Sequence, residues 1–246
     1  MSTATLESNP RDEFASCETA NFNRLARVYR WLEWFTFGPM LGKCRFAYLA
    51  EMKYRRAALV IGDGDGRFTA QLLKQNPHIA VDAVDVSDPM LRRLKQRAGC
   101  HAGRVRSHLA DARQLRLARG KFDLIATHFF LDCLTTVEVE SLAMGLRESI
   151  TSDGAWVVSE FAIPDNWYGR LIARPIVTVL YLAFGCLTGL AIRELPRHRE
   201  ALQRAGFILT GQRKRLSGLL VSELWKPDPA AHPDPHSTEH QISVAP

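Results

Sequence analysis

Closely spaced cysteines are missing from this sequence of 246 residues. The five cysteines lie far apart, with no CxxC pair and no matching histidine spacing: Cys17, Cys44, Cys100, Cys133 and Cys186. Zinc sites and disulfide frameworks both depend on close spacing of such residues. We therefore predict neither a metal site nor a disulfide framework, and a reducing, cytoplasmic environment for the chain.

A signal peptide and a nucleic-acid-binding tract are missing as well. Residues 1–20 are polar and carry acids, without the basic start and apolar run of a signal peptide, so we interpret them as a flexible leader. The net charge is only +6, and no arginine-rich tract interleaved with aromatic residues occurs, so no nucleic-acid partner is expected. The hydrophobic content of 46% is typical of a soluble globular protein, and the length fits one domain over 21–225.

Short apolar runs alternate regularly with helical patterns along most of the chain. The predicted strands are 57–61, 80–85, 105–109, 122–127, 155–161, 207–210 and 219–225. Strands that alternate with helices are typical of βαβ units and a parallel sheet with helices on both faces. The sequence therefore predicts an α/β fold: a Rossmann-like, doubly wound sheet of seven strands, the last two of which form an antiparallel hairpin.

Further segments flank or interrupt this pattern. Residues 21–54 are predicted to form a helical cap, with one amphipathic helix over 21–37 and a second over 40–53. Residues 164–195 are predicted to be an apolar helical insertion between the fifth and sixth strands. The proline- and histidine-rich tail, 226–246, is expected to be disordered.

The apolar stretch 171–192 has about the length of a membrane span. Arg174, Pro175 and two glycines interrupt it, which favours a pair of buried helices. A lipophilic pocket and a shallow contact with a membrane surface remain open alternatives, because arginines near both ends can bind anionic head groups. Peripheral contact with a membrane is thus an alternative to a purely cytoplasmic location.

Alternating glycines follow the first predicted strand. Gly62, Asp63, Gly64, Asp65 and Gly66 form a turn that leads into a helix. Glycines accept positive φ and let a ligand approach the backbone at the positive end of the helix. The dinucleotide fingerprint GxGxxG would need another glycine where this chain has an arginine, at position 67. Acids beside the turn suit a cationic ligand better than a pyrophosphate.

Acids also follow the second and third predicted strands. Asp85 and Val86 end the second strand, and a carboxylate there can accept both hydroxyls of a ribose. Asp111 and Ala112 follow the third strand, where the acid can accept from an adenine amine. Ligands of open α/β sheets bind at the carboxyl ends of the strands, so these acids favour a nucleoside ligand.

Together these residues resemble class I S-adenosylmethionine-dependent methyltransferases over roughly 21–225. The resemblance implies that the glycine turn, with Asp63 and Asp65, contacts the amino-acid part of the cofactor, S-adenosyl-L-methionine. It also implies that Asp85 and Val86 hold the ribose, and that Asp111 and Ala112 bind the adenine. The N-terminal helix is similar to the cap of ubiquinone and menaquinone methyltransferases, whose tyrosine closes over the cofactor; here that residue is Tyr29.

The chain departs from the family at Val60. An acid usually stands two residues before the first glycine, where it orders the loop or reaches the methionine amine. The resemblance then implies that Asp63 or Asp65 takes over this task. A protein that binds the donor without catalysing transfer is therefore one alternative, and a nicotinamide-dependent oxidoreductase is another.

The end of the fourth strand carries the candidates for the acceptor site. The resemblance places the segment from Thr127 to Phe129 at the methyl-transfer site, with Thr127 near the cofactor. His128 is the candidate general base, and packing is its alternative role. Asp132 either orients His128, binds a polar acceptor or starts a helix. The leading hypothesis is methyl transfer to a small hydrophobic acceptor, such as a quinone-like phenol or a lipid amine.

Overall fold

The structure is a computed structural model that describes residues 38–164, 166–175, 177–178 and 195–231. The predicted leader, the helix over 21–37 and most of the apolar stretch 171–192 lie outside the described residues. Tyr29 does too.

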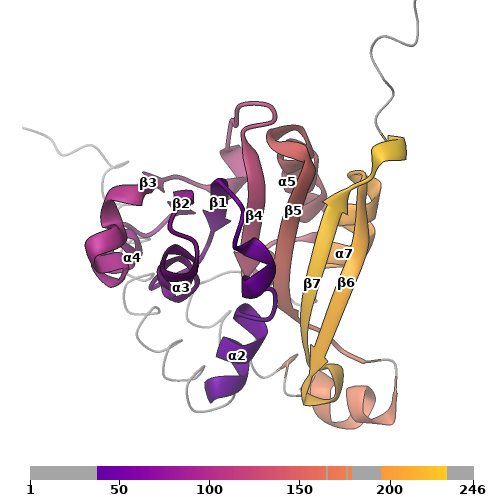
Figure 1. Ribbon diagram of the computed structural model, residues 1–246. Coiled ribbons are helices and arrows are strands. Elements are labelled where there is room, and N and C mark those ends of the chain that lie inside the picture. The colour runs from indigo at the N-terminus through magenta and orange to yellow at the C-terminus, as the bar shows by residue number, and fades with distance from the viewer. Residues whose placement is uncertain (1–37, 165, 176, 179–194, 232–246) are drawn as a thin grey trace, which may run out of the picture.

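A single sheet of seven strands, in the order β3-β2-β1-β4-β5-β7-β6, runs through the described residues (Figure 1). The strands are β1 (Ala57–Ile61), β2 (Ala80–Asp85), β3 (Val105–Leu109), β4 (Phe122–His128), β5 (Ile150–Phe161), β6 (Phe207–Arg215) and β7 (Leu220–Pro227). The first five strands pair in parallel, whereas β7 pairs antiparallel with both β5 and β6. The chain order reverses between β1 and β4, which is where α/β sheets bind their ligands. The predicted fold class is confirmed.

Helices cover both faces of the sheet (Figure 1). They are α2 (Gly38–Arg45), α3 (Arg67–Gln75), α4 (Asp88–Ala98), α5 (Thr136–Ser149) and α7 (His198–Arg204), with short 3-10 turns that include η1 (Leu49–Met52), η3 (Ala112–Gln114) and η4 (Leu131–Cys133). Because side chains alternate along a strand, Val60 of β1 packs in the cluster that includes α3, whereas Ile61 packs in the cluster that includes α5. Local sequence starts α5, where Thr135 and Glu138 form a capping box.

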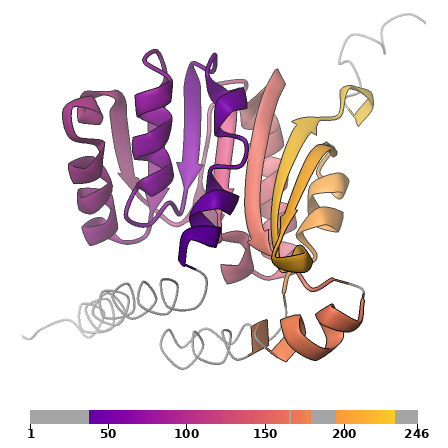
Figure 2. The same cartoon turned by 60° about the horizontal axis from the view of Figure 1, so that its bottom comes forward.

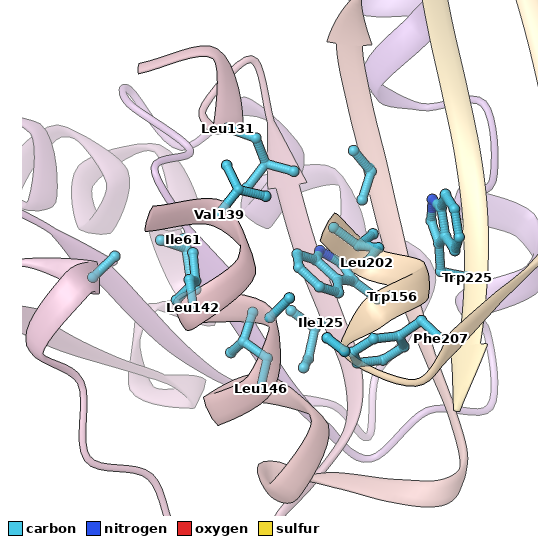
Figure 3. Close-up of a cluster of buried hydrophobic side chains, with 14 of the residues drawn as sticks. Ile61, Ile125, Leu131, Val139, Leu142, Leu146, Trp156, Leu202, Phe207 and Trp225 are labelled. Atoms are coloured by element: carbon cyan, nitrogen blue, oxygen red, sulfur yellow. The ribbon is translucent and has the colours of Figure 1, made fainter. Parts of the chain in front are cut away.

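The core on the α5 face centres on aromatic residues. Trp156 of β5 and Trp225 of β7 are fully buried, and Phe207 of β6 meets Trp156 edge to face at 5.3 Å. Leu146 of α5 and Leu202 of α7 complete this cluster (Figure 3). The packing joins the antiparallel hairpin to the parallel part of the sheet, so that β5 and the residues after β4 have a rigid support.

The helix predicted over 40–53 is instead two short helices, α2 and η1. The carbonyl oxygen of Cys44 accepts hydrogen bonds from the hydroxyls of Ser222, at 2.7 Å, and Ser159, at 3.4 Å. The backbone turns tightly there, with the amide of Ala47 donating to the same oxygen. Contacts with distant strands therefore end the helix early.

Residues 226–231 have more regular structure than the sequence predicts. β7 continues to Pro227, which pairs with Phe207, and the amide of Asp228 donates to the carbonyl oxygen of Gly206 at 2.8 Å. β6 extends to Arg215 instead of position 210. The prediction of disorder is wrong for 226–231, because pairing with a neighbouring strand supplies the hydrogen bonds that local sequence does not.

The described part of the insertion lies beyond the end of β5, beside the turn that joins β6 and β7 (Figure 2). A π-helix runs over Gly169–Ala173, and Gly169 approaches the carbonyl of Pro164 too closely for any side chain. Ala173 and Val177 belong to one buried cluster with Leu220, whereas Trp167 and Leu171 of this segment are exposed. None of the helices in the described part of the chain is long and apolar enough to cross a membrane.

Candidate active site

The glycine turn has the backbone geometry that the sequence predicts. Gly62, Gly64 and Gly66 all have positive φ, at 68°, 57° and 80°. A Cβ on Gly62 would lie 2.6 Å from the Phe130 ring, and one on Gly66 would lie 2.6 Å from the Cα of Leu94. Gly64 has no neighbour within 4 Å of a built Cβ. Packing thus requires two of the glycines, and the third leaves open space beside the backbone.

Asp63 has a structural task within this turn. Its carboxylate accepts hydrogen bonds from the backbone amides of Phe68, at 3.2 Å, and Thr69, at 2.8 Å, in the first turn of α3. Burial raises the pKa of Asp63, and the nearby charge of Arg45 opposes this rise. The carboxylate therefore holds the helix against the glycine turn, which is part of the role that the family usually gives to an acid at position 60.

The carboxylate of Asp65 also forms ion pairs within the protein. Its Oδ2 forms ion pairs with Arg97 at 2.9 Å and with Arg67 at 3.3 Å, and Arg97 also donates to the backbone carbonyl of Asp65. These contacts tie the glycine turn to the end of α4. The same arginine that breaks the dinucleotide fingerprint, Arg67, thus neutralises an acid of the turn.

Asp85 ends β2 next to the glycine turn, because Gly62 donates its backbone amide to the carbonyl oxygen of Val84 at 3.0 Å. Oδ1 of Asp85 accepts from the amide of Ser87 at 2.8 Å. Burial raises the pKa of Asp85 to about 6, and the nearby carboxyl of Asp63 adds to the rise. A partly buried carboxylate with spare acceptor capacity is suited to hydroxyl donors.

Asp111 follows β3 at the same edge of the sheet and caps η3. Its carboxylate is held by Arg113, at 2.6 Å, which lowers the pKa of Asp111. Arg113 also pairs with Glu138 of α5 at 3.1 Å. Ala112 is buried, whereas Val86 after β2 is exposed. The two acids after β2 and β3 therefore lie at the ends of adjacent strands, as predicted.

The structure places Thr127 differently from the sequence prediction. Its side chain is 0% exposed, and the hydroxyl accepts a hydrogen bond from Nε1 of Trp156 at 3.0 Å. The side chain therefore packs in the α5-side core, next to Trp156. Strand alternation explains this, since His128 points to the opposite face.

His128 is buried against α3 and α2. Its ring lies 4.3 Å from that of Phe68, and Nδ1 is 3.0 Å from the hydroxyl of Ser159. Because Ser159 donates its proton to the carbonyl oxygen of Cys44, Nδ1 of His128 is the donor to Ser159. Nε2 is then an acceptor, buried and without a hydrogen-bond partner in the part of the chain that the structure describes.

The surroundings of His128 make it a weak base. Burial, followed by the charge of Arg45, holds the pKa of His128 well below its usual value. Asp132 does not orient the ring, because Ser159 occupies the nitrogen that an orienting carboxylate would take. No hydrogen bond therefore joins Asp132 to His128 in the described part of the chain, which contradicts the predicted orienting role.

Asp132 lies in the tight turn that follows β4. Phe129 has a positive φ of 54°, which is uncommon for a residue with a side chain, and its amide donates to the carbonyl oxygen of Ser159 at 2.7 Å. The amides of Phe130 and Leu131 then donate to Oε1 of Glu160, at 3.1 and 2.9 Å. The end of β5 thus fixes the turn that carries Asp132.

Glu160 and Arg45 are functional candidates that the sequence reasoning missed. Glu160 stands within an apolar strand, and such a break in an apolar run is a usable signal. Arg45, the last residue of α2, is buried near Asp63 and His128. Only the tertiary structure brings these three residues together. No group of three or more metal-ligating side chains occurs among the residues that the structure describes.

Residues 58–154 match a family described as a methyltransferase domain. The central part of the chain is thus similar to a methyltransferase domain, which confirms the predicted resemblance to class I S-adenosylmethionine-dependent methyltransferases. The narrower likeness to ubiquinone and menaquinone enzymes stays a prediction.

One curated relative is the carboxy-S-adenosyl-L-methionine synthase of Nautilia profundicola, 24% identical over 143 residues. The match covers 58% of this chain and 58% of the relative, so the chain spans little more than half the length of that protein.

Solved structures show the same fold. The 1,6-didemethyltoxoflavin-N1-methyltransferase of Burkholderia thailandensis, solved with S-adenosylhomocysteine bound, has a TM-score of 0.62 at 19% identity and covers 92% of this chain and 93% of that one. An O-methyltransferase family protein from the same organism has a TM-score of 0.64 at 16% identity, covering 85% of this chain and 61% of that one.

Proposed function

We propose that this protein transfers the methyl group of S-adenosylmethionine to a small, hydrophobic acceptor. The observation that carries the proposal is the position of Asp85, a partly buried carboxyl at the end of β2, beside the backbone of Gly62 at the switch point of the sheet. A carboxylate at this point accepts the two hydroxyls of a ribose.

The other donor contacts follow from the same edge of the sheet. Gly64 leaves the backbone open to the amino-acid part of the donor. Asp111, whose carboxylate also binds Arg113, is assigned to the adenine amine because it follows β3 at the same edge of the sheet. Asp63 and Asp65 act indirectly, by fixing the turn, and Val86 covers the ribose.

When bound, S-adenosylmethionine supplies a methyl group on a sulfonium, which is a good leaving group. The task of the protein is then to hold the acceptor in line with the methyl group and to exclude water. His128 contributes an acceptor nitrogen at Nε2, and its low pKa assigns it to hydrogen bonding more than to proton storage.

Aromatic and apolar side chains near the end of β4 support a hydrophobic acceptor, such as a quinone-like phenol or a lipid amine. Phe129 packs against Phe161 at 5.2 Å, and both belong to a cluster with Ala173 and Val177 of the insertion. Leu171, on the same segment, is 71% exposed. The exposed apolar side chain of Leu171 also supports peripheral contact with a membrane.

A thermal-shift comparison tests the donor site. S-adenosylhomocysteine at about 100 times its Kd should stabilise the protein by about 2.7 kcal/mol, and NAD should not. Stabilisation by NAD alone would identify a nicotinamide-dependent oxidoreductase instead.

A transfer assay with tritiated donor then tests the reaction, with phenols, amines and a lipid extract as acceptors. Label should move into a small hydrophobic product. Tight donor binding without transfer to any of these acceptors would identify a protein that binds the donor without catalysis, the alternative that Val60 suggests.

The likeness to a carboxy-S-adenosyl-L-methionine synthase favours a second candidate, chemical modification of the donor itself. Mass spectrometry of the recovered donor, after incubation with carboxylate-bearing small molecules, separates this activity from methyl transfer. A heavier donor and an unlabelled acceptor would favour the second candidate.

A further inference from the structure

Two carboxyl groups lie together at the carboxyl edge of the sheet, apart from the acids proposed to hold the donor. Glu160 is near the end of β5, and Asp132 lies in η4, directly after β4. We propose that Asp132 takes the proton of the methyl acceptor and that Glu160 positions Asp132 for this task. The inference rests on the methyl transfer proposed above and specifies an acceptor whose nucleophilic atom carries a proton.

The position of Asp132 is set by Glu160. Oε1 of Glu160 accepts the amides of Phe130 and Leu131, the two residues directly before Asp132, at 3.1 and 2.9 Å. The neighbouring residue of β5, Ser159, accepts the amide of Phe129 at the start of the same turn. Hydrogen bonds from one strand therefore fix the whole turn that presents Asp132.

Oε2 of Glu160 gives an independent reason to expect chemistry here. Glu160 is 1% exposed, and its Oε2 has no hydrogen-bond partner in the described part of the chain. A buried carboxylate oxygen without a donor is unfavourable, so the proton of a neutral Glu160 resides on Oε2. Two neighbouring carboxyls do not both ionise readily, so a neutral Glu160 leaves the negative charge to Asp132.

The acidities of the two groups agree with this arrangement. Burial, and then the charge of Asp132, raise the pKa of Glu160 well above its usual value. Burial raises the pKa of Asp132 to about 6, a value suited to accepting a proton near neutral pH. The groups that lower the pKa of Asp132 include the thiol and the backbone amide of Cys133, on the same turn, and His198 of α7, which pairs with Glu223 at 3.2 Å.

The turn that carries Asp132 reaches the proposed donor site. The Phe130 ring packs on Gly62, at 2.6 Å from the position of a built Cβ. Burial, and then the charges of Asp132, Glu160 and Asp85, raise the pKa of the Cys133 thiol, which lies next to Asp132. Asp132 therefore belongs to the turn that packs against the glycine turn of the proposed donor site.

The reaction balances with these groups alone. The bond between sulfur and the methyl carbon breaks, and its electron pair stays on sulfur. A bond forms between that carbon and an oxygen or nitrogen of the acceptor, whose proton passes to the Asp132 carboxylate. Glu160 keeps its own proton throughout, so that Asp132 is the group that receives the proton of the acceptor. This chemistry fits hydroxyl groups and neutral amines on aromatic rings.

Asp132→Asn and Glu160→Gln test the proposal in the full-length chain. The probes are a hydroquinone and an aniline, with tritiated S-adenosylmethionine as donor, which separates oxygen from nitrogen acceptors. Asp132→Asn should lower kcat by about 100-fold or more. Its affinity for S-adenosylhomocysteine should change less than about twofold, since general-base catalysis leaves donor binding untouched.

Glu160→Gln keeps the oxygen that accepts the turn amides, and its neutral amide takes the place of the protonated carboxyl. The value of kcat and its pH profile should therefore stay close to those of the wild-type protein, because the charge beside Asp132 is unchanged. Glu160→Ala removes the acceptor for the turn amides and should lower kcat with little change in donor affinity. Matched controls are Asp153→Asn and Glu148→Gln, on exposed carboxyls far from the turn.

Full kcat in Asp132→Asn or in Glu160→Ala overturns the proposal, and a kcat in Glu160→Gln as low as that of Glu160→Ala contradicts the positioning role of Glu160. The proposal is also overturned if the wild-type protein methylates carbon or thiol acceptors but neither the hydroquinone nor the aniline. Loss of S-adenosylhomocysteine binding in Asp132→Asn would assign that residue to the donor instead. A wild-type protein that binds no S-adenosylhomocysteine would contradict the proposed function itself, which is a separate result.

Discussion

Phe130 packs against Gly62, and a Cβ on the glycine would lie 2.6 Å from the ring. The two residues belong to the turns that follow β4 and β1, the strands on either side of the switch point. This contact joins the proposed donor turn to the turn that carries Asp132. A substitution of either residue should therefore affect both donor binding and the turn that carries Asp132.

Gly62→Ala should destabilise the protein and weaken donor binding. The new Cβ meets the Phe130 ring at a backbone φ of 68°, and such overpacking costs about 1–3 kcal/mol. Urea unfolding and calorimetry with S-adenosylhomocysteine measure the two effects. Gly99→Ala is the matched control, because Gly99 has a φ of 57° with no neighbour within 4 Å of a built Cβ. Equal losses in both variants would show that backbone strain alone is responsible.

Asp85→Asn should weaken binding of S-adenosylhomocysteine by at least about tenfold and leave the melting temperature of the free protein nearly unchanged. A charge-assisted hydrogen bond to each ribose hydroxyl is lost, worth about 1.5–3 kcal/mol. Asp88→Asn, on the adjacent exposed acid, is the control. Unchanged affinity in Asp85→Asn would contradict the ribose assignment.

Donor affinity should also fall as pH decreases through about 6 in the wild-type protein. Asp85 has its pKa raised to about 6 in the free protein, so it takes up a proton there and loses acceptor strength. Calorimetry between pH 8 and pH 5 measures this dependence, and Asp85→Asn should abolish it. A pH dependence that survives in the variant would point to another group.

Thr127→Val should lower stability without affecting donor affinity. The change leaves the buried Nε1 of Trp156 without its acceptor, which costs about 1–3 kcal/mol. Thr127→Ser keeps the hydroxyl and should restore most of this stability. Weakened donor binding in a Thr127→Val protein that remains folded would return Thr127 to the cofactor site.

The free energy of unfolding should decrease at acidic pH, because the stabilising contribution of Glu223 is lost when its carboxylate takes up a proton. Donors from His198, Arg199, Gln212 and Trp225 surround this buried carboxylate, and its pKa is lowered to about 2. The folded pKa lies below the usual value of 4.5, so the stabilisation is present above about pH 4.5 and is lost as pH falls towards 2. The full effect is on the order of 3 kcal/mol.

Urea unfolding of Glu223→Gln between pH 7 and pH 3 measures this contribution. The variant should be less stable at neutral pH and should show a flatter decline than the wild type. Glu148→Gln, on an exposed acid of α5, is the control. Parallel pH curves for wild type and Glu223→Gln would show that other carboxyls cause the acid sensitivity.

The sequence by itself determined the order of strands and helices and the positions of the acids at strand ends. Periodicity gives this information because a strand buried on both faces reads as a continuous apolar run, as in Ala57–Ile61. Glycines with positive φ and the capping box of α5 are also local features that the chain can show without tertiary contacts.

Only the tertiary structure decided what the polar side chains do. Thr127 faces the core because Trp156 supplies a donor there, and His128 turns to Ser159 of the neighbouring strand. α2 ends at Arg45 because Cys44 bonds to hydroxyls more than a hundred residues further along the chain. Glu160 meets the turn of Asp132 for the same reason: hydrogen bonds between distant segments depend on which strands are neighbours, and no local pattern encodes that.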